Sequence, residues 1–241
     1  RQRQMCIRDR ARRVKKEDLT RLARATGGRV VVTLADMEGV PPVETTGQVR
    51  WFKRPTPGHT YLVSLDPSMG TGGDYAAIQI FELPTFEQIG EWHHNQTPMN
   101  QQVRILQGIN KHIHDTIMEK DSTATPQIFY SMENNTIGEA ALMRVMDIGE
   151  ENIMGMFLSE PIRKGHRRKF RRGFNTTAKH KIDACTKFKE LVENDKMKIN
   201  SQLLISEMKD FVATGLSYKA KPGQHDVLVS AFLLMTRMLK V

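Results

Sequence analysis

The sequence predicts an α/β fold built on a mixed sheet, in which three antiparallel strands are followed by parallel crossovers and helices flank the sheet. Short apolar runs bounded by Pro, Gly or Asp begin at residue 61, and three of them follow one another closely, as in a meander. Apolar residues then recur at helical spacing across 99–118. From there to the end of the chain, helix-like and strand-like stretches alternate, which is typical of crossover connections.

The chain before the first regular strand is expected to hold little stable structure. Residues 1–16 indicate a basic, disordered lead, for which a non-native extension is the alternative, because their composition differs sharply from that of the rest of the chain. A short helix over 17–25 and a strand-like run over 29–34 come next. The Pro-, Gly- and Thr-rich stretch 38–46 indicates a linker, and a second strand-like run covers 48–53.

These features divide the chain into three parts. The lead covers residues 1–16, a connector or the remnant of a missing N-terminal domain covers 17–57, and the main domain covers 58–241. Because the first residue is Arg1 and not Met, the chain is expected to be a fragment.

Within the main domain, each element is bounded by a local signal. The first strand ends at Asp66-Pro67, Pro84 separates the second strand from the third, and Thr177 is the expected N-cap of the third helix. The predicted strands are 61–65, 75–81, 86–93, 127–132, 153–158 and 197–199, and the predicted helices are 99–118, 138–146, 178–193, 201–211 and 226–239.

The formal net charge of +9 is concentrated in two segments. Residues 1–16 carry +7, residues 163–172 carry seven Lys or Arg and no acid, and the rest of the chain stands at −5. A basic segment inside an acidic body favours contact with the phosphates of nucleic acid, whereas a solvated charged loop is the alternative. The residues expected to contact DNA are Lys164, Arg167, Arg168, Lys169, Arg171 and Arg172.

Other patterns exclude several classes of protein. The two cysteines, Cys6 and Cys185, form no metal-binding spacing, and their small number indicates a reducing compartment. The longest apolar stretch, 227–235, is too short to cross a membrane, and no signal peptide is visible, so a secreted or membrane protein is not expected. No Walker A phosphate loop is present.

Three acidic residues stand at the ends of predicted core elements. Asp66 ends a strand before a glycine-rich turn, Glu133 ends another strand, and Asp226 precedes the last helix. A turn residue, a strand cap and a helix N-cap are the respective structural alternatives. If the three meet, each like-charged pair about 4 Å apart repels by about 4 kcal/mol at an effective dielectric constant of 20, so the cluster requires cations.

Oxygen-only ligands favour Mg²⁺ or Mn²⁺, and two such ions can activate a water molecule and stabilise the leaving oxygen of a phosphodiester. Asp74, at the far end of the glycine-rich loop, is a further candidate ligand. His225, beside Asp226, is a candidate accessory residue for proton transfer or for orienting a ligand.

Three runs together resemble the acidic motifs of the nuclease domain of bacteriophage large terminase subunits: YLVSLDPSMGTGGDYAAIQIF (61–81), IFYSMENNTIGE (128–139) and LSYKAKPGQHDVLVSAFLL (216–234). Residues 173–199 resemble the segment between the second and third motifs, so the resemblance covers about 49–241 in the correct order. It implies an RNase H-like fold and a metal-dependent endonuclease that cuts concatemeric viral DNA by a two-metal-ion reaction during packaging.

By this resemblance Asp66, Glu133 and Asp226 are the acidic triad and Asp74 an accessory acid. The implied partners are double-stranded viral DNA, a portal protein, a small terminase subunit and an ATPase domain absent from this chain, in the host cytoplasm and without a membrane. One feature departs from the family: a second acid often follows the first in the third motif, and here Val227 stands in its place.

Two other functions are compatible with the same residues. The loop DPSMGTGGD also resembles the first phosphate loop of actin-like and sugar-kinase ATPases, although neither a second phosphate loop nor an adenosine-binding segment is found. A non-catalytic basic DNA-binding module is the other alternative, and it predicts that the three acids lie far apart.

Overall fold

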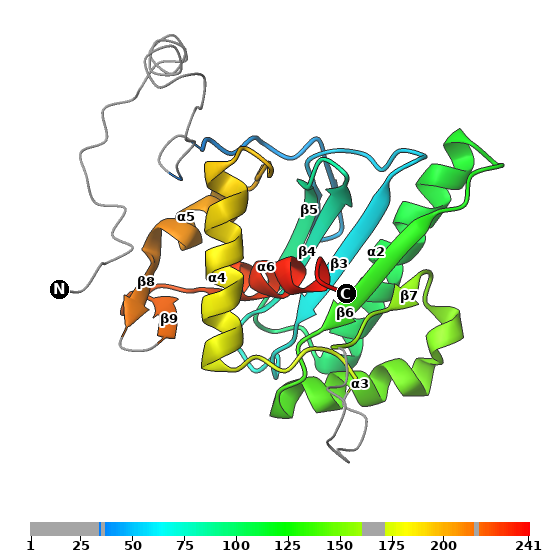
Figure 1. Ribbon diagram of the computed structural model, residues 1–241. Helices are drawn as coiled ribbons and strands as arrows, with labels where there is room; N and C mark the ends of the chain where they lie inside the picture. The colour runs from blue at the N-terminus through cyan, green and yellow to red at the C-terminus, as the bar shows by residue number, and fades with distance from the viewer. Residues whose placement is uncertain (1–33, 35–36, 161–171, 215–216) are drawn as a thin grey trace, which may run out of the picture.

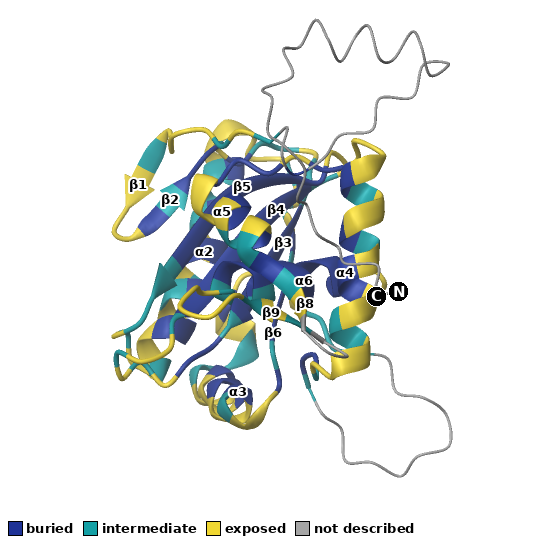
Figure 2. Ribbon diagram, turned by 90° about the vertical axis from the view of Figure 1, so that its left-hand side faces the viewer, coloured by how far each residue is buried: buried dark blue, intermediate teal, exposed yellow. Residues whose placement is uncertain are grey.

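A mixed sheet of seven strands lies at the centre of the described part of the chain, and helices cover both of its faces (Figures 1 and 2). The computed structural model describes residues 34, 37–160, 172–214 and 217–241. The strand order is β1-β2-β5-β4-β3-β6-β7. The predicted lead 1–16, the helix 17–25 and nearly all of the run 29–34 lie outside the described residues.

The middle of the sheet is an antiparallel meander formed by β3 (Thr60–Asp66), β4 (Ala76–Leu83) and β5 (Glu87–His94). β4 pairs with β3 on one side and with β5 on the other. All but the last residue of β4 are buried, because both faces of the sheet are covered. The three antiparallel strands that the sequence predicts are therefore confirmed.

Parallel strands extend one edge of the meander and antiparallel strands the other. β6 (Gln127–Met132) runs parallel to β3, and β7 (Met156–Phe157) runs parallel to β6. On the opposite side β2 (Val49–Trp51) pairs with β5, and β1 (Glu44–Thr46) pairs with β2. These last two strands fall within the predicted connector 17–57 and belong to the same sheet.

Two helical layers enclose the sheet and give it two separate hydrophobic cores. α2 (Met99–Lys120) and α3 (Thr136–Ile148) cover one face, and α2 buries the apolar stripe that the helical spacing predicts. The opposite face carries α4 (Ala178–Glu193), α5 (Gln202–Asp210) and α6 (Val227–Met238) (Figure 1). A short 3-10 helix, Glu150–Asn152, links α3 to β7. None of the described helices is long and apolar enough to span a bilayer.

The structure differs from the predicted elements in three places. The strand predicted at 153–158 is only two residues long, because Gly155, directly before it, has a φ of +104°, outside the range of a β-strand. The strand predicted at 197–199 is reduced to a single bridge between Lys198 and Glu87. A hairpin of β8 (Phe211–Thr214) and β9 (Ser217–Ala220) was not predicted.

Candidate active site

Asp66 and Glu133 lie side by side at one edge of the sheet. β3 and β6 pair in parallel, with Leu65 opposite Met132. The residues that follow these two, Asp66 and Glu133, are therefore neighbours as well. The Glu133 amide donates a hydrogen bond to the Leu65 carbonyl at 3.0 Å, which continues the ladder to the strand ends. Because parallel strands finish at the same edge, their pairing brings the two carboxylates together.

The Glu133 side chain is oriented by the start of α3. Asn135 donates from Nδ2 to Glu133 Oε2 at 2.8 Å, while its own Oδ1 accepts the Gly138 amide at 2.8 Å as the helix N-cap. Gly138 is required here, since a Cβ at this position would come within 1.8 Å of the Glu133 carbonyl oxygen. Asn135 therefore both caps α3 and fixes the side chain of Glu133.

Asp226 reaches the same edge from the opposite layer of helices. Ser64 donates to the Ala231 carbonyl at 2.7 Å and fixes α6 against β3. Asp226 occupies the N-cap position of α6, yet its side chain makes no capping hydrogen bond within the described residues. Instead Oδ2 accepts the Ala220 amide at 3.2 Å and lies 3.6 Å from Lys181 Nζ. The simple N-cap role does not account for this carboxylate.

A second acid performs the capping role that Asp226 leaves open. Glu207 on α5 accepts the Val229 amide, in the first turn of α6, at 3.2 Å. Burial raises the pKa of Glu207 to about 7, the α6 amides oppose that rise, and the charge of Asp226 adds to it. Nothing in the sequence distinguishes Glu207 from an ordinary surface acid of an amphipathic helix.

The three predicted acids interact electrostatically around Asp66. Burial is the largest cause that holds the pKa of Asp66 well above its usual range, followed by the charge of Glu133 and a hydrogen bond with it, and then by the charge of Asp226. Lys181 acts in the opposite sense. The site therefore carries an excess of negative charge that a proton or a cation must relieve.

This set of donors fits a hard divalent cation, because every candidate ligand is a carboxylate oxygen. Within the described residues, no three His, Cys, Asp or Glu side chains already converge as the ligands of one ion. Glu133 and Asp226 both act electrostatically on Asp66, where a divalent ion would offset the negative charges.

Asp74 and His225 are both exposed, and neither is among the groups that act most strongly on Asp66. Asp74 is exposed at the end of the glycine-rich loop, and its carboxylate makes no hydrogen bond or ion pair within the described chain. His225 is exposed beside Asp226 and packs edge-on against Tyr75, with ring centroids 5.2 Å apart. Tyr75 also lies 5.6 Å from the His93 ring, so it contacts both histidine rings.

The basic segment starts and ends beside Glu133. Asn134 donates to the Arg172 carbonyl at 2.6 Å, and the Glu160 amide donates to the Gly173 carbonyl at 3.2 Å. Arg172 itself lies 2.6 Å from Glu150 and stacks over Phe157, so it is paired within the fold. The other expected DNA contacts, Lys164, Arg167, Arg168, Lys169 and Arg171, lie outside the described residues.

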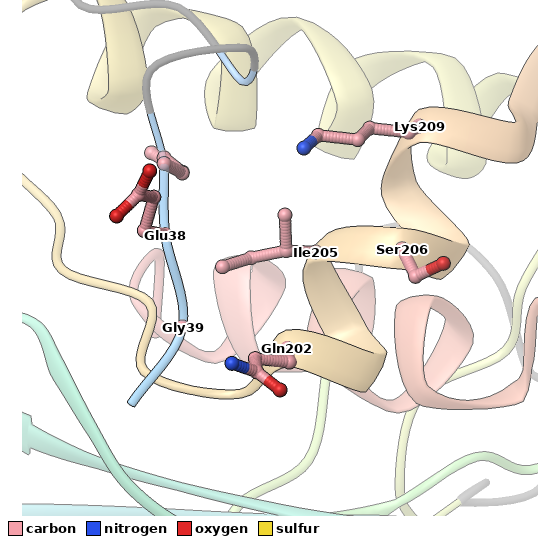
Figure 3. Close-up of a pocket in the computed structure, with 7 residues that line it drawn as sticks. Glu38, Gly39, Gln202, Ile205, Ser206 and Lys209 are labelled. Carbon is pink, nitrogen blue, oxygen red and sulfur yellow. The ribbon is translucent and has the colours of Figure 1, made fainter. Parts of the chain in front are cut away.

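A cavity of about 380 Å³ lies elsewhere, between residues 37–39 and α5 (Figure 3). Glu38 and Lys209 are its charged lining residues. None of the predicted site residues lines it, so it is separate from the acidic site.

Replacing Gly138 by Ala tests the close approach that orients Glu133. The added methyl group would meet the Glu133 carbonyl, so we expect a loss of about 1–3 kcal/mol in the free energy of unfolding, measured with urea. Gly108→Ala is the matched control, because Gly108 on α2 has open space and alanine is expected to stabilise the helix by up to about 1 kcal/mol. Equal effects of both changes would contradict this geometry.

Asp66→Asn tests the electrostatic strain of the metal-free site. Since the pKa of Asp66 is raised in the folded protein, the folded state keeps its proton to a higher pH than the unfolded chain, and stability falls as the pH rises above 3.8 through the folded pKa. Asp66→Asn has no carboxylate at this position, so it is not expected to lose stability in this way as the pH rises. In a chelator at pH 7 it is expected to be about 1–2 kcal/mol more stable than the wild type.

Asp115→Asn is the control for that experiment. Hydrogen bonds from Lys111 and His114 lower the pKa of Asp115, so its replacement is not expected to stabilise the protein. If thermal unfolding shows the same pH dependence in the wild type and in Asp66→Asn, the carboxylates do not repel one another as described.

The fold is similar to solved structures of terminase nuclease domains. The large terminase nuclease from thermophilic phage G20c with bound magnesium aligns over 86% of this chain and 95% of its own, at 16% identity and a TM-score of 0.62. The large terminase nuclease domain of Thermus phage P74-26 covers 83% of this chain and 90% of its own, at 16% identity and a TM-score of 0.58. The human cytomegalovirus terminase nuclease domain covers 75% of this chain and 82% of its own, at 13% identity and a TM-score of 0.50.

No protein-family model matches the chain. The likeness to the solved structures, together with the observed strand order, confirms the RNase H-like mixed sheet that the sequence resemblance implied.

Proposed function

We propose that this chain is a metal-dependent DNA endonuclease domain of a viral packaging terminase, which cuts concatemeric genomes by two-metal-ion phosphodiester hydrolysis. The observation that carries the proposal is the electrostatic grouping of Glu133 and Asp226 around Asp66, at the end of two parallel strands. The likeness to terminase nucleases of known structure supports the same reaction class.

In this proposal the three acids hold Mg²⁺ or Mn²⁺, and the bound ions supply an activated water and stabilise the leaving 3′ oxygen. Asp66 and Glu133 bind from adjacent strands, whose ladder fixes their backbone positions. Asn135 orients Glu133, while the Ala220 amide and Lys181 orient Asp226. Each acid therefore has its own support, and Asp74 and His225 remain accessory candidates.

The basic segment is proposed to hold the DNA backbone. Arg172, just after residues 161–171, accepts a hydrogen bond from Asn134, and Glu160, just before them, donates to the Gly173 carbonyl, so the residues that flank this segment lie next to the stretch that follows Glu133. Contacts of Lys and Arg with phosphates position a duplex without reading its sequence. Because Arg172 is paired with Glu150, we assign to it an additional role in anchoring the segment.

The likeness also suggests the setting in which the domain works. We propose that residues 58–241 form the nuclease domain, that 17–57 include the connector to an ATPase domain, and that 1–16 form a separate basic lead. The proposed partners are double-stranded viral DNA, a portal protein and a small terminase subunit, in the cytoplasm of the host.

Nicking of supercoiled plasmid in Mn²⁺ tests the reaction. Asp66→Asn is expected to lower the nicking rate by at least about 100-fold, because it removes a carboxylate that would hold the metal ions at the reacting phosphate. Asp115→Asn, an exposed change on α2, is expected to keep wild-type activity. Full Mn²⁺-dependent nicking by Asp66→Asn would disprove the mechanism and favour the non-catalytic DNA-binding module.

The salt dependence of DNA binding tests the basic segment. Replacing Arg167, Arg168 and Arg171 together by Ala is expected to reduce the slope of log K against log salt by about 0.9 for each lost phosphate contact. Arg144→Ala is the control, since Arg144 is paired with Asp147 on α3. An unchanged slope in the triple variant would exclude this segment as the DNA contact.

A further inference from the structure

We propose that Tyr75, together with the rings of His93 and His225, forms a nucleobase-binding subsite beside the acids, which takes an unpaired base of the DNA strand next to the phosphate that is cut. This inference rests on the proposed function, since it names the part of the substrate that these rings would contact. It gives a role to Tyr75 and His93, which the proposed reaction leaves unused.

The sheet register places His93 in the same row as Asp66. In the antiparallel meander Asp66 pairs with Ala77, and Ala77 pairs in turn with His93. Residues directly opposite each other on neighbouring strands point to the same face of the sheet, so the side chains of Asp66 and His93 do as well. Two strand spacings separate their backbones by about 10 Å. Ala77, the residue between them, carries only a methyl group and packs in the core under α6.

Tyr75 connects His93 to the start of α6. The centroid of its ring lies 5.6 Å from that of His93 and 5.2 Å from that of His225. His225 directly precedes Asp226, whose charge acts on Asp66. Asp66 is the last residue of β3, and His93 is the last but one of β5. These contacts therefore place the three rings along the same edge and face of the sheet as the acids.

Burial distinguishes these rings from the aromatic pairs of the core. Phe81 and Phe232 contact each other with both side chains buried, so their rings serve in packing. His225 is exposed, and Tyr75 and His93 are half-buried at the ends of the strands. Part of their surface is therefore open to a ligand.

Arg50 holds the His93 ring in a neutral form. Its guanidinium lies 2.9 Å from His93 Nδ1 and 3.0 Å from a carboxylate oxygen of buried Glu91. Because a guanidinium only donates, Nδ1 accepts this hydrogen bond and the ring proton is on Nε2. Burial, followed by the charge of Arg50, lowers the pKa of His93 to about 4, so the ring is neutral at pH 7. His93 therefore offers a flat, uncharged surface in a fixed orientation.

A base reaches these rings only when it has left the helical stack. In an intact duplex the faces of each base are covered by its neighbours, whereas an unpaired base exposes a π-face that stacks on an aromatic side chain. With a phosphate at the acids, the strand would bring a neighbouring base to the side of Tyr75. The subsite therefore favours an unpaired strand next to the cut, with little preference for its sequence.

Fluorescence anisotropy titrations with a labelled single-stranded oligonucleotide test this inference, in the presence of Ca²⁺, a cation that carboxylates bind. One abasic residue is moved along the strand. In the wild type, the abasic residue is expected to weaken binding by at least about fivefold at one position, because it removes the stacked base. Tyr75→Leu is expected to weaken binding of the intact strand by the same factor, and to remove the difference between the intact and the abasic strand.

The control variants separate the ring from other effects of substitution. Tyr75→Phe keeps the ring and is expected to bind both strands as the wild type does. His112→Leu is the matched control, because His112 contacts the Trp51 ring and belongs to α2, on the opposite face of the sheet. Thermal unfolding shows whether Tyr75→Leu is folded. His225→Ala, a change at an exposed residue, is the second variant and is expected to reduce the same difference.

The outcomes distinguish this inference from the proposed function. Equal affinity of the wild type for the intact strand and for every abasic strand would overturn the subsite, as would an unchanged difference in both Tyr75→Leu and His225→Ala. If the wild type still nicks plasmid in Mn²⁺ and Asp66→Asn does not, the nuclease proposal stands without the subsite. If the wild type neither nicks plasmid nor binds the oligonucleotide, both proposals are wrong.

Discussion

Repulsion between carboxylates that the sheet forces together is the constraint on which the rest of the site depends. The parallel pairing of β3 and β6 fixes the ends of both strands, so Asp66 and Glu133 cannot separate without breaking the ladder. α6, which Ser64 holds against β3, brings Asp226 to the same edge. The fold therefore builds up negative charge at one point and leaves its neutralisation to protons, to Lys181 and to a bound cation.

Buried acids elsewhere in the fold are paired, whereas the acids of the site carry an excess of negative charge. Buried Glu82 pairs with Lys53, and Glu87 lies 2.6 Å from Lys198. Glu91 accepts Ser201 Oγ at 2.6 Å and lies 3.0 Å from Arg50. These acids join β4 and β5 to neighbouring elements through paired charges or hydrogen bonds, as buried acids of a stable core normally do. Within the described chain, the acids at the ends of β3 and β6 therefore differ from these paired acids, because they repel each other.

The sequence predicts the sheet and the position of the acids well, because both depend on local patterns. Apolar runs mark β3 and β6, and a carboxylate directly after each run must lie at the sheet edge. Thr177 is recognisable as the N-cap of α4 and does accept the His180 amide. Lys181 and Glu207 could not be predicted, since their roles arise from the packing of α4 and α5 against the start of α6. The β8–β9 hairpin was missed because its strands are short and only partly apolar.

Anomalous X-ray diffraction from crystals soaked in Mn²⁺ tests the central claim most directly, because it locates the ion without reference to activity. The account predicts an anomalous peak between the carboxylates of Asp66 and Glu133, at the edge where β3 and β6 end. A peak bound elsewhere on the protein, with none at these two side chains, would contradict it.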